Sequence, residues 1–240
     1  ISENQLSGFT KFICRQHSGL GADGCVFLSK NSKGDLSFRI FNKDGSEAEM
    51  SGNGARCAAA HLHRSGHNHE EPVILATKSG KKILKLIGIK DSLRWTYCSE
   101  MGKAFFLPEK IPCLIKELKI VSEHFLEIEG QEVEVNALSV GNPQCVVILD
   151  RLPKTEKFRY LGSKLETHAL FPNRTNVSFV QVIDRKKILI QVWERGVGAT
   201  ASSGTGCCGA AVTVIRLGLC DSPVEVSTTS GSQFVQWKLD

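Results

Sequence analysis

The chain has 240 residues, of which 41% are hydrophobic and 23% are charged, and its formal net charge is +5. This composition is that of a globular protein with one large domain or two smaller ones. Lysine and arginine are scattered along the chain rather than gathered into a basic stripe, which argues against a nucleic-acid-binding protein. No apolar run approaches the length of a membrane span. We therefore expect a partner of small-molecule size, with no nucleic acid and no membrane involved.

The nine cysteines have no regular spacing, and no Cys-x-x-Cys pair occurs. Most of them lie within apolar segments, as reduced thiols that pack as small hydrophobic side chains do. This usage favours a cytoplasmic protein over a disulfide framework or a zinc site. Asn-x-Ser/Thr triplets begin at Asn173 and Asn176, and we interpret them as chance matches to the glycosylation motif.

Apolar periodicity and turn residues predict the secondary structure of the first half. The expected elements are a helix over residues 4–17, strands Cys25–Ser29 and Leu36–Asn42, a helix from Ser51 to about His63, and strands from Val73 to Cys98 broken at Gly80, Gly88 and Asp91.

The pattern loosens around residues 99–112, where Pro108 and Pro112 lie, so we expect domains 1–105 and 106–240. Strands and helices mix in each half without regular βαβ alternation, which predicts an α+β fold of two similar, pseudo-symmetric domains. Each should be a set of mostly antiparallel strands around a central helix. In the second half the expected elements are strands at about 115–121, 125–128 and 131–139, strand Cys145–Leu149, a helix at about 156–168, strands Val177–Val182 and Ile188–Trp193, a helix to about Leu217, and strands Val224–Thr228 and Phe234–Trp237.

Two segments match the glycine pattern G-x-G-x-x-G, at Gly19–Gly24 and Gly204–Gly209. A dinucleotide site needs a strand before the glycines and a helix after them. The first segment has the reverse order, and the second stands a loop away from its strand without a clear acidic partner. We interpret the first as a tight turn and discount nucleotide binding at both.

The motif Ser-Gly-x-Gly followed by an alanine-rich run occurs twice, from Ser51 and from Ser203. A short polar residue before glycine suits a helix start, and alanine is the best helix former. Each copy therefore predicts a helix N-terminus with free backbone N–H groups, which is a ready site for a carboxylate. Two such ends could hold one small acid.

Four histidines, His61, His63, His67 and His69, follow the first of these helices. They could form a metal site, but they straddle a helix end and a polar loop. A solvated helix C-terminus, where histidine suits the helix dipole, is the interpretation that we favour.

Polar residues accompany each Ser-Gly-x-Gly motif, and an arginine at a strand end can hold a carboxylate in a bidentate manner. Taken singly, Arg195 could be a surface ion pair with Glu194, and the asparagines could be turn formers. Together with the two helix starts they favour an amino-acid site. These residues are Asn42, Glu47, Glu49 and Ser51 in the first half and Asn142, Asn176, Glu194, Arg195 and Ser203 in the second.

Seven segments, in order and over most of the chain, resemble the diaminopimelate epimerase family. That family is a group of pyridoxal-independent amino-acid racemases and epimerases with two pseudo-symmetric domains and a substrate cleft between them. They interconvert LL- and meso-diaminopimelate, in the synthesis of lysine and peptidoglycan precursors. The segments are Gly21-Ala22-Asp23-Gly24, Phe41–Glu47, Gly52–Cys57, Gly141-Asn142-Pro143, Asn176, Glu194-Arg195-Gly196 and Gly204-Thr205-Gly206.

The resemblance implies a role for each matched residue. Gly52, Asn53, Gly204 and Thr205 would offer N–H groups to the α-carboxylate, and Glu194 would hold the α-amino group. Asn42, Asn142, Asn176 and Arg195 would contact the distal end of the substrate. The family moves the α-proton with two cysteines, and helix dipoles that lower a thiol pKa would make metal and pyridoxal cofactors unnecessary. Dimers are common in the family, so a homodimer is one expectation.

The chain departs from the family at the chemistry. Ser51 and Ser203 occupy the positions of the two cysteines, and Gln144 stands where the family usually has histidine. A hydroxyl is a far weaker acid than a thiol and needs an adjacent base. The nearby thiols Cys57 and Cys207, with Cys208, should face the core. The chain also starts just after the family's first strand and its Gly-Asn-Asp-Phe motif and lacks its last segment, so we expect a sequence or a fold that is shorter than usual.

Three hypotheses follow from these departures. The protein is an epimerase whose cysteines were replaced to trap a substrate, with little or no activity as it stands. Alternatively, it is a natural amino-acid-binding homologue that has lost the chemistry. The third possibility is a related enzyme in which a serine acts as a single base, for instance in the dehydration of a hydroxy amino acid.

Overall fold

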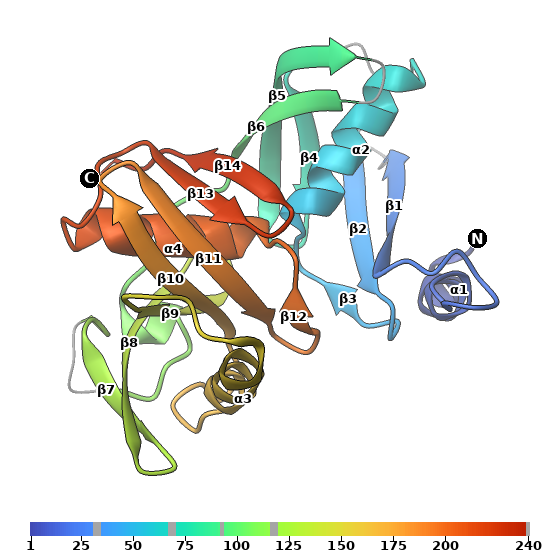
Figure 1. The fold of residues 1–240 in the computed structure, drawn as a ribbon. Coiled ribbons are helices and arrows are strands. Elements are labelled where there is room, and N and C mark those ends of the chain that lie inside the picture. Colours follow the sequence, from blue (N-terminus) through green and yellow to red (C-terminus); the bar gives the residue numbers. More distant parts are fainter. Residues whose placement is uncertain (31–34, 67–70, 92–93, 116–119, 239–240) are drawn as a thin grey trace. The chain divides into compact units, whose positions relative to one another are not determined.

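The computed structural model describes residues 1–30, 35–66, 71–91, 94–115 and 120–238. The chain divides into two compact units, Ile1–Glu100 and Met101–Asp240 (Figure 1). The division falls at 100/101, where the sequence suggested 105/106. Each unit is built from a sheet and its own helices, so the α+β class is confirmed.

The first unit contains one sheet in the order β1-β2-β4-β5-β6, with β3 paired to β2. All of its pairs are antiparallel except β2 with β4. Its elements are the 3₁₀ turn Glu3–Gln5, α1 (Leu6–Ile13), β1 (Gly24–Lys30), β2 (Leu36–Asn42), β3 (Glu47–Ala48), α2 (Gly52–Arg64), β4 (Val73–Thr77), β5 (Gly80–Asp91) and β6 (Arg94–Glu100).

Helix α2 supplies the core of the first unit with small side chains. Ala55, Ala59 and Leu62 are buried on its inner face, at the spacing that one face of a helix requires. They pack against Phe38 of β2 and Leu75 of β4. Alanine lets the backbone of the helix approach the sheet closely, and a Cβ atom at Gly54 in the first turn would lie 3.2 Å from Val26 Cγ2 of β1.

The second unit contains a larger sheet in the order β14-β13-β11-β10-β9-β8-β7, with β12 paired to β11. Two pairs, β9 with β10 and β11 with β13, are parallel. Its elements are the 3₁₀ turn Pro108–Lys110, β7 (His124–Ile128), β8 (Gln131–Ser139), β9 (Pro143–Ile148), α3 (Thr155–Glu166), β10 (Asn176–Asp184), β11 (Lys187–Glu194), β12 (Gly198–Thr200), α4 (Gly204–Arg216), β13 (Val224–Thr228) and β14 (Gly231–Val235).

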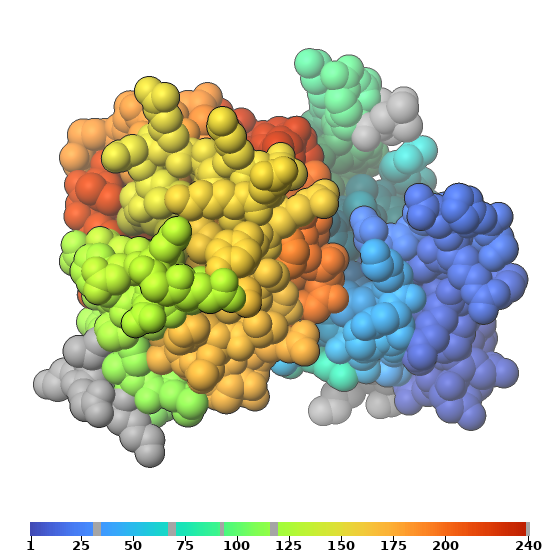
Figure 2. Space-filling model, turned by 60° about the horizontal axis from the view of Figure 1, so that its bottom comes forward, coloured from blue at the N-terminus to red at the C-terminus, as the bar shows by residue number. Residues whose placement is uncertain are grey.

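Helices cover both faces of this sheet, because alternate strand residues point to opposite sides. Val177 and Phe179 of β10 pack with Phe158 of α3, whereas Val180 packs with Ala210 of α4. In Figure 2 the yellow residues of α3 lie at the surface of this unit. Strand β10 is therefore buried on both faces over its first five residues.

Most of the predicted elements are confirmed. Strands Leu36–Asn42 and Val224–Thr228 have the predicted bounds, and both Ser-Gly-x-Gly motifs open helices. The helix over 4–17 is shorter than expected, since α1 ends at Ile13. Gly88 does not break β5 but lies at a shift of its register with β6.

Two strands of the structure were absent from the prediction, and one predicted strand is untested. The missed strands, β3 and β12, are too short to show a period of two. The strand expected at 115–121 lies largely outside the described residues, and residues 115, 120 and 121 belong to no strand.

The first G-x-G-x-x-G segment is a turn between α1 and β1, as predicted. Leu20 N donates to Ile13 O, and Gly21 has a φ of +69°. A Cβ atom at Gly19 would lie 2.3 Å from Ile13 O, so only glycine fits there.

Candidate active site

The two Ser-Gly-x-Gly motifs form nearly identical helix starts. Ser51 has φ −137° and ψ 121°, and Ser203 has φ −136° and ψ 124°. Each hydroxyl caps its own helix, since Ser51 Oγ accepts from Gly54 N at 3.1 Å and Ser203 Oγ accepts from Gly206 N at 3.3 Å. The shared geometry confirms that the motif is one structural unit used twice.

Both helix starts keep backbone donors for an anion. The first N–H groups of a helix have no intrahelical acceptor. At α4 these are the N–H groups of Gly204 and Thr205, and at α2 they are those of Gly52 and Asn53. The helix dipole adds partial positive charge at the same place. These are the four residues that the sequence predicts as carboxylate donors.

The start of α4 lies against Ser178 of β10 and Val192 of β11. A Cβ atom at Gly206 would lie 3.3 Å from both Ser178 Oγ and Val192 Cγ1, so the missing side chain lets the helix approach β10 and β11 closely. The Ser178 hydroxyl is buried without a hydrogen-bond partner. The helix end is therefore held in place by contact rather than left to fray.

Glu194, the last residue of β11, contacts the cap of α4 directly. Its Oε2 accepts a hydrogen bond from Ser203 Oγ at 3.0 Å. Glu194 is half-buried and Ser203 is only 4% exposed, so little water competes for this bond. The hydroxyl thus has the adjacent carboxylate base that serine chemistry requires.

Two further side chains form a chain of hydrogen bonds to Thr205, the second residue of α4. Gln144 Nε2 donates to Asn142 Oδ1 at 2.7 Å, and Asn142 Nδ2 donates to Thr205 Oγ1 at 3.3 Å. Gln144 is fully buried, and its Oε1 has no partner. The amide group of Asn142 therefore turns its donor side toward the helix start.

Asn176 holds the turn that carries Glu194 and Arg195. Its Nδ2 donates to Pro143 O at 2.9 Å, and its Oδ1 accepts from Arg195 N at 3.0 Å. Arg195 is half-buried as a residue, and its guanidinium donates from Nη1 to Asn173 O at 3.3 Å. The second unit thus joins Asn142, Asn176, Glu194, Arg195, Ser203 and Thr205 in one set of neighbouring contacts.

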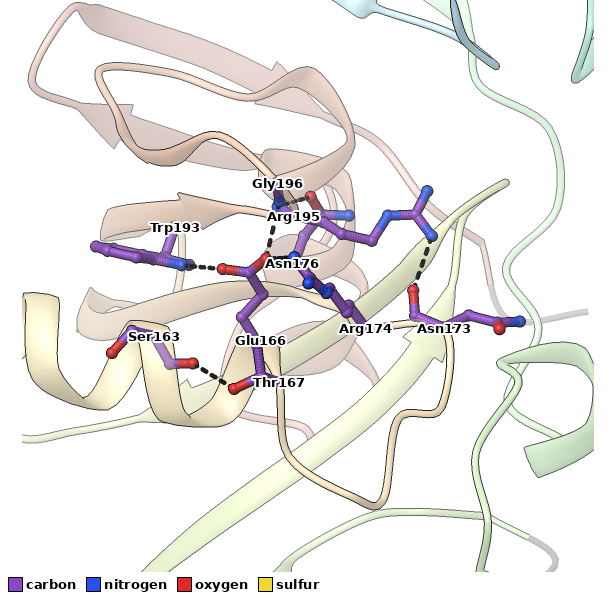
Figure 3. Close-up of polar contacts among 9 residues, drawn as sticks. All are labelled: Ser163, Glu166, Thr167, Asn173, Arg174, Asn176, Trp193, Arg195 and Gly196. Carbon is purple, nitrogen blue, oxygen red and sulfur yellow. Dashed lines mark hydrogen bonds and ion pairs between the residues drawn. The ribbon is translucent and has the colours of Figure 1, made fainter. Parts of the chain in front are cut away.

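Sequence reasoning missed Glu166, which also bonds to this turn (Figure 3). Its side chain is 9% exposed and accepts from Gly196 N and from the indole of Trp193. A signal was present, because Glu166 is one turn beyond Gly162 on the buried face of α3. A charged residue at a core-facing helical position predicts a partnered carboxylate.

In the first unit, the predicted polar residues bond mainly to local groups. Asn42 Nδ2 donates to Ser46 Oγ at 3.0 Å, and Asn53 Oδ1 accepts from Arg56. Glu47 is bound by Arg39 and Lys78, which hold its pKa at about 2. Glu49 is exposed, so Ser51 has no carboxylate partner among the described residues that corresponds to Glu194.

The cysteines agree only in part with the expectation that they pack inside. None of the nine is in a disulfide, and Cys207 is fully buried, but Cys57 is exposed and Cys208 is half-buried. The prediction for Cys57 is wrong because its position in α2 lies on the solvent side, between the buried Ala55 and Ala58. Burial raises the pKa of Cys145 far above its ordinary value.

The described residues contain no group of three or more His, Cys, Asp or Glu side chains placed to hold a metal ion. Of the four histidines in question, His67 and His69 lie outside the described residues. His63 packs between the rings of Trp95 and Tyr97, with its Nδ1 2.7 Å from Tyr97 Oη. Among the described helices, none is both long and apolar enough to span a membrane.

Solved structures define the class of fold. A hydroxyproline epimerase from Agrobacterium vitis matches with a TM-score of 0.67 at 17% identity, covering 94% of this chain and 69% of that one. A probable proline racemase from Agrobacterium radiobacter K84 matches with a TM-score of 0.68 at 16% identity, covering 96% and 72%. The chain therefore has the fold of these racemases and epimerases.

The sequence comparisons identify the family. The family model for diaminopimelate epimerase matches residues 1–107 and 136–240. The diaminopimelate epimerase of Carboxydothermus hydrogenoformans is 38% identical over 99% of this chain and 84% of that protein. Diaminopimelate epimerase 2 of Nostoc sp. is 39% identical over 96% and 79%. The chain belongs to the diaminopimelate epimerase family, a family of isomerases.

Proposed function

We propose that this protein binds diaminopimelate and interconverts its LL and meso forms only slowly, because hydroxyls replace the two thiols of the family. The capped start of α4 carries this proposal. There the N–H groups of Gly204 and Thr205 offer donors to an α-carboxylate, while Glu194 offers an acceptor to an α-ammonium group.

In this proposal the distal end of the ligand contacts Asn42, Asn142, Asn176 and Arg195. A guanidinium has five N–H donors in a planar fork, and the bond to Asn173 O uses Nη1. A second carboxylate is the natural partner for the rest of the fork. Asn176 acts on the same group indirectly, through the backbone of Arg195.

Slow proton transfer follows from the chemistry of the hydroxyl group. A thiol has a pKa of about 8.5, so its thiolate is accessible near neutral pH, whereas a serine hydroxyl is a much weaker acid. The helix dipole favours an anion at either position. The stabilisation that the dipole gives to the anion is far smaller than the difference in acidity between a thiol and a hydroxyl. The nine cysteines, none of which is in a disulfide, favour a cytoplasmic location, which forms part of the proposal.

The test is deuterium incorporation at the α-carbon of LL- and meso-diaminopimelate in D₂O, with binding measured separately by calorimetry. We expect the chain to bind the ligand and exchange slowly. The double variant Ser51→Cys/Ser203→Cys should exchange at least about 100-fold faster, because a thiolate can form. If the double variant binds diaminopimelate but exchanges no faster, the epimerase proposal is contradicted. If the unaltered chain does not bind diaminopimelate, the assignment of this ligand is contradicted.

The hydrogen bond between Ser203 and Glu194 favours a second candidate, a dehydratase that acts on a β-hydroxy amino acid. Ser203 Oγ would take the α-proton while passing its own proton to Glu194. The β-carbon–oxygen bond would break, and the proton from Glu194 would leave with the hydroxide as water. The unsaturated amino acid would tautomerise to an imine, which water hydrolyses to a 2-oxo acid and ammonia. Formation of a 2-oxo acid from serine or threonine, and its loss in Glu194→Gln, would support this candidate over the first.

A further inference from the structure

The turn Glu194-Arg195-Gly196 joins β11 to β12 and carries two of the residues assigned to the ligand. Val197 N donates to Glu194 O at 3.0 Å, and Gly196 has a φ of +75°. Gly196 and Val197 are exposed, so the hydrophobic core does not hold the tip of this turn. Its position must come from specific contacts.

Glu166, the last residue of α3, accepts hydrogen bonds from residues at both ends of the turn (Figure 3). Its Oε1 accepts from Gly196 N at 2.9 Å, and its Oε2 accepts from Trp193 Nε1 at 2.7 Å. The two donors come from the residue just before Glu194 and the residue just after Arg195. Both oxygens of one buried carboxylate are therefore used to bracket the two ligand-facing residues.

The indole of Trp193 can reach Glu166 because α3 leaves room for it. A Cβ atom at Gly162 would lie 2.8 Å from Trp193 Cδ2 and Cγ, so the indole lies directly against the helix backbone. Phe158 packs edge-on against the same ring at 6.0 Å. Helix α3 thus provides both the space in which the indole lies and the carboxylate that accepts its N–H hydrogen bond.

The loop before β10 completes the arrangement. Arg174 Nη1 lies 3.5 Å from Glu166 Oε1, with which it forms an ion pair, and Thr175 N donates to Glu166 O at 3.2 Å. Asn176 Oδ1 accepts from Arg195 N in the middle of the turn. Arg174 adopts the left-handed φ of +57°, which is uncommon for a residue with a Cβ atom.

We propose that Glu166 is a positioning residue, which holds Glu194 toward Ser203 and Arg195 toward the distal carboxylate by fixing the turn between them. The proposal rests on the ligand assigned under the proposed function. A carboxylate suits this task better than an amide, because it accepts at both oxygens and its bonds are charge-assisted. A glutamine would turn an NH₂ group toward one of the two donors.

The variant Glu166→Gln tests the proposal, with Glu129→Gln as the matched control. Glu129 also binds α3 through a carboxylate, to Tyr160 and Lys164, but it does not contact the turn. Calorimetry with meso-diaminopimelate should show a dissociation constant at least about 10-fold weaker for Glu166→Gln, the effect of losing one charge-assisted hydrogen bond. Glu129→Gln should bind as the unaltered chain does. Equal binding by Glu166→Gln overturns the proposal.

Amide hydrogen exchange separates this proposal from the proposed function. The Gly196 amide and the Trp193 indole N–H should be protected in the unaltered chain and in Glu129→Gln. Both should exchange faster in Glu166→Gln, with the core of β10 unchanged. Failure of the unaltered chain to bind overturns the ligand assignment alone. Unchanged protection of Gly196 in Glu166→Gln overturns the positioning role whether or not the ligand binds.

Discussion

Glu194 and Ser203 lie nine positions apart in the sequence, at the end of a strand and the start of a helix, and their side chains are joined by a hydrogen bond of 3.0 Å. The Ser203 hydroxyl donates to the carboxylate and accepts from Gly206 N at the same time. A hydroxyl performs both tasks well, whereas a thiol is a weak donor and a weak acceptor. The serine therefore stabilises the start of the helix through both of its hydrogen bonds.

The substitution Glu194→Gln should weaken diaminopimelate binding by about 10-fold or more, because a charged acceptor for an ammonium group becomes a neutral amide. Calorimetry at neutral pH measures this change. Glu127→Gln is the control, since Glu127 is an exposed carboxylate on β7 of the same unit. Equal losses in the two variants would show a general charge effect and contradict the assignment of Glu194 to the ligand.

Loss of the caps should be measurable in the stability of the chain. Ser51→Ala should lower the free energy of unfolding by about 1 kcal/mol, the usual cost of removing an N-cap. Ser203→Ala should cost about 2 kcal/mol or more, because it also removes a hydrogen bond to a charged group. Urea unfolding followed by circular dichroism provides the values. Ser163→Ala, on α3, is the control for the same change away from a helix start, and Ser203→Ala should cost clearly more.

Gly162→Ala should destabilise the second unit by about 1–3 kcal/mol through overpacking, although alanine is the better helix former. The new methyl group would lie 2.8 Å from the indole of Trp193, which is held on its other sides. Gly8→Ala in α1 is the matched control, since nothing lies within 4 Å of the added atom. That change should stabilise the chain slightly, by up to about 1 kcal/mol. A stabilising effect of Gly162→Ala would contradict the close packing of Trp193 on α3.

The acid stability of the first unit should depend on Glu47. Arg39 and then Lys78 lower its pKa from 4.5 to about 2 by hydrogen bonds and charge. A carboxyl group with a lowered pKa stabilises the fold above the unfolded value, and this contribution is lost as the pH falls from 4.5 toward 2. Allowing for screening at the half-exposed Lys78, it should amount to about 2 kcal/mol.

The corresponding measurement is the unfolding midpoint in urea at several pH values between neutrality and pH 2. In Glu47→Gln the unfolding free energy should be lower at neutral pH and should fall less steeply across the acid range. A variant with the same pH dependence as the unaltered chain would show that another carboxyl group is responsible.

Local patterns in the sequence were sufficient to predict much of this protein. Serine before glycine and an alanine run predicted both helix starts, because capping and helix propensity act over a few residues. Alternation predicted the bounds of β2 and β13. The order of the motifs predicted the family. These features depend on near neighbours in the chain, so they can be recognised without the fold.

Tertiary structure decided what the polar residues contact. Asn176 and Glu166 are distant in sequence from Arg195 and Gly196, yet they bond to consecutive backbone amides of one turn. Glu47 was grouped with the first helix start and is instead bound by Arg39 and Lys78. Cys57 was expected inside and is exposed. A buried polar group takes whichever partner the packing of sheet and helix brings within about 3 Å, and no local pattern encodes that choice.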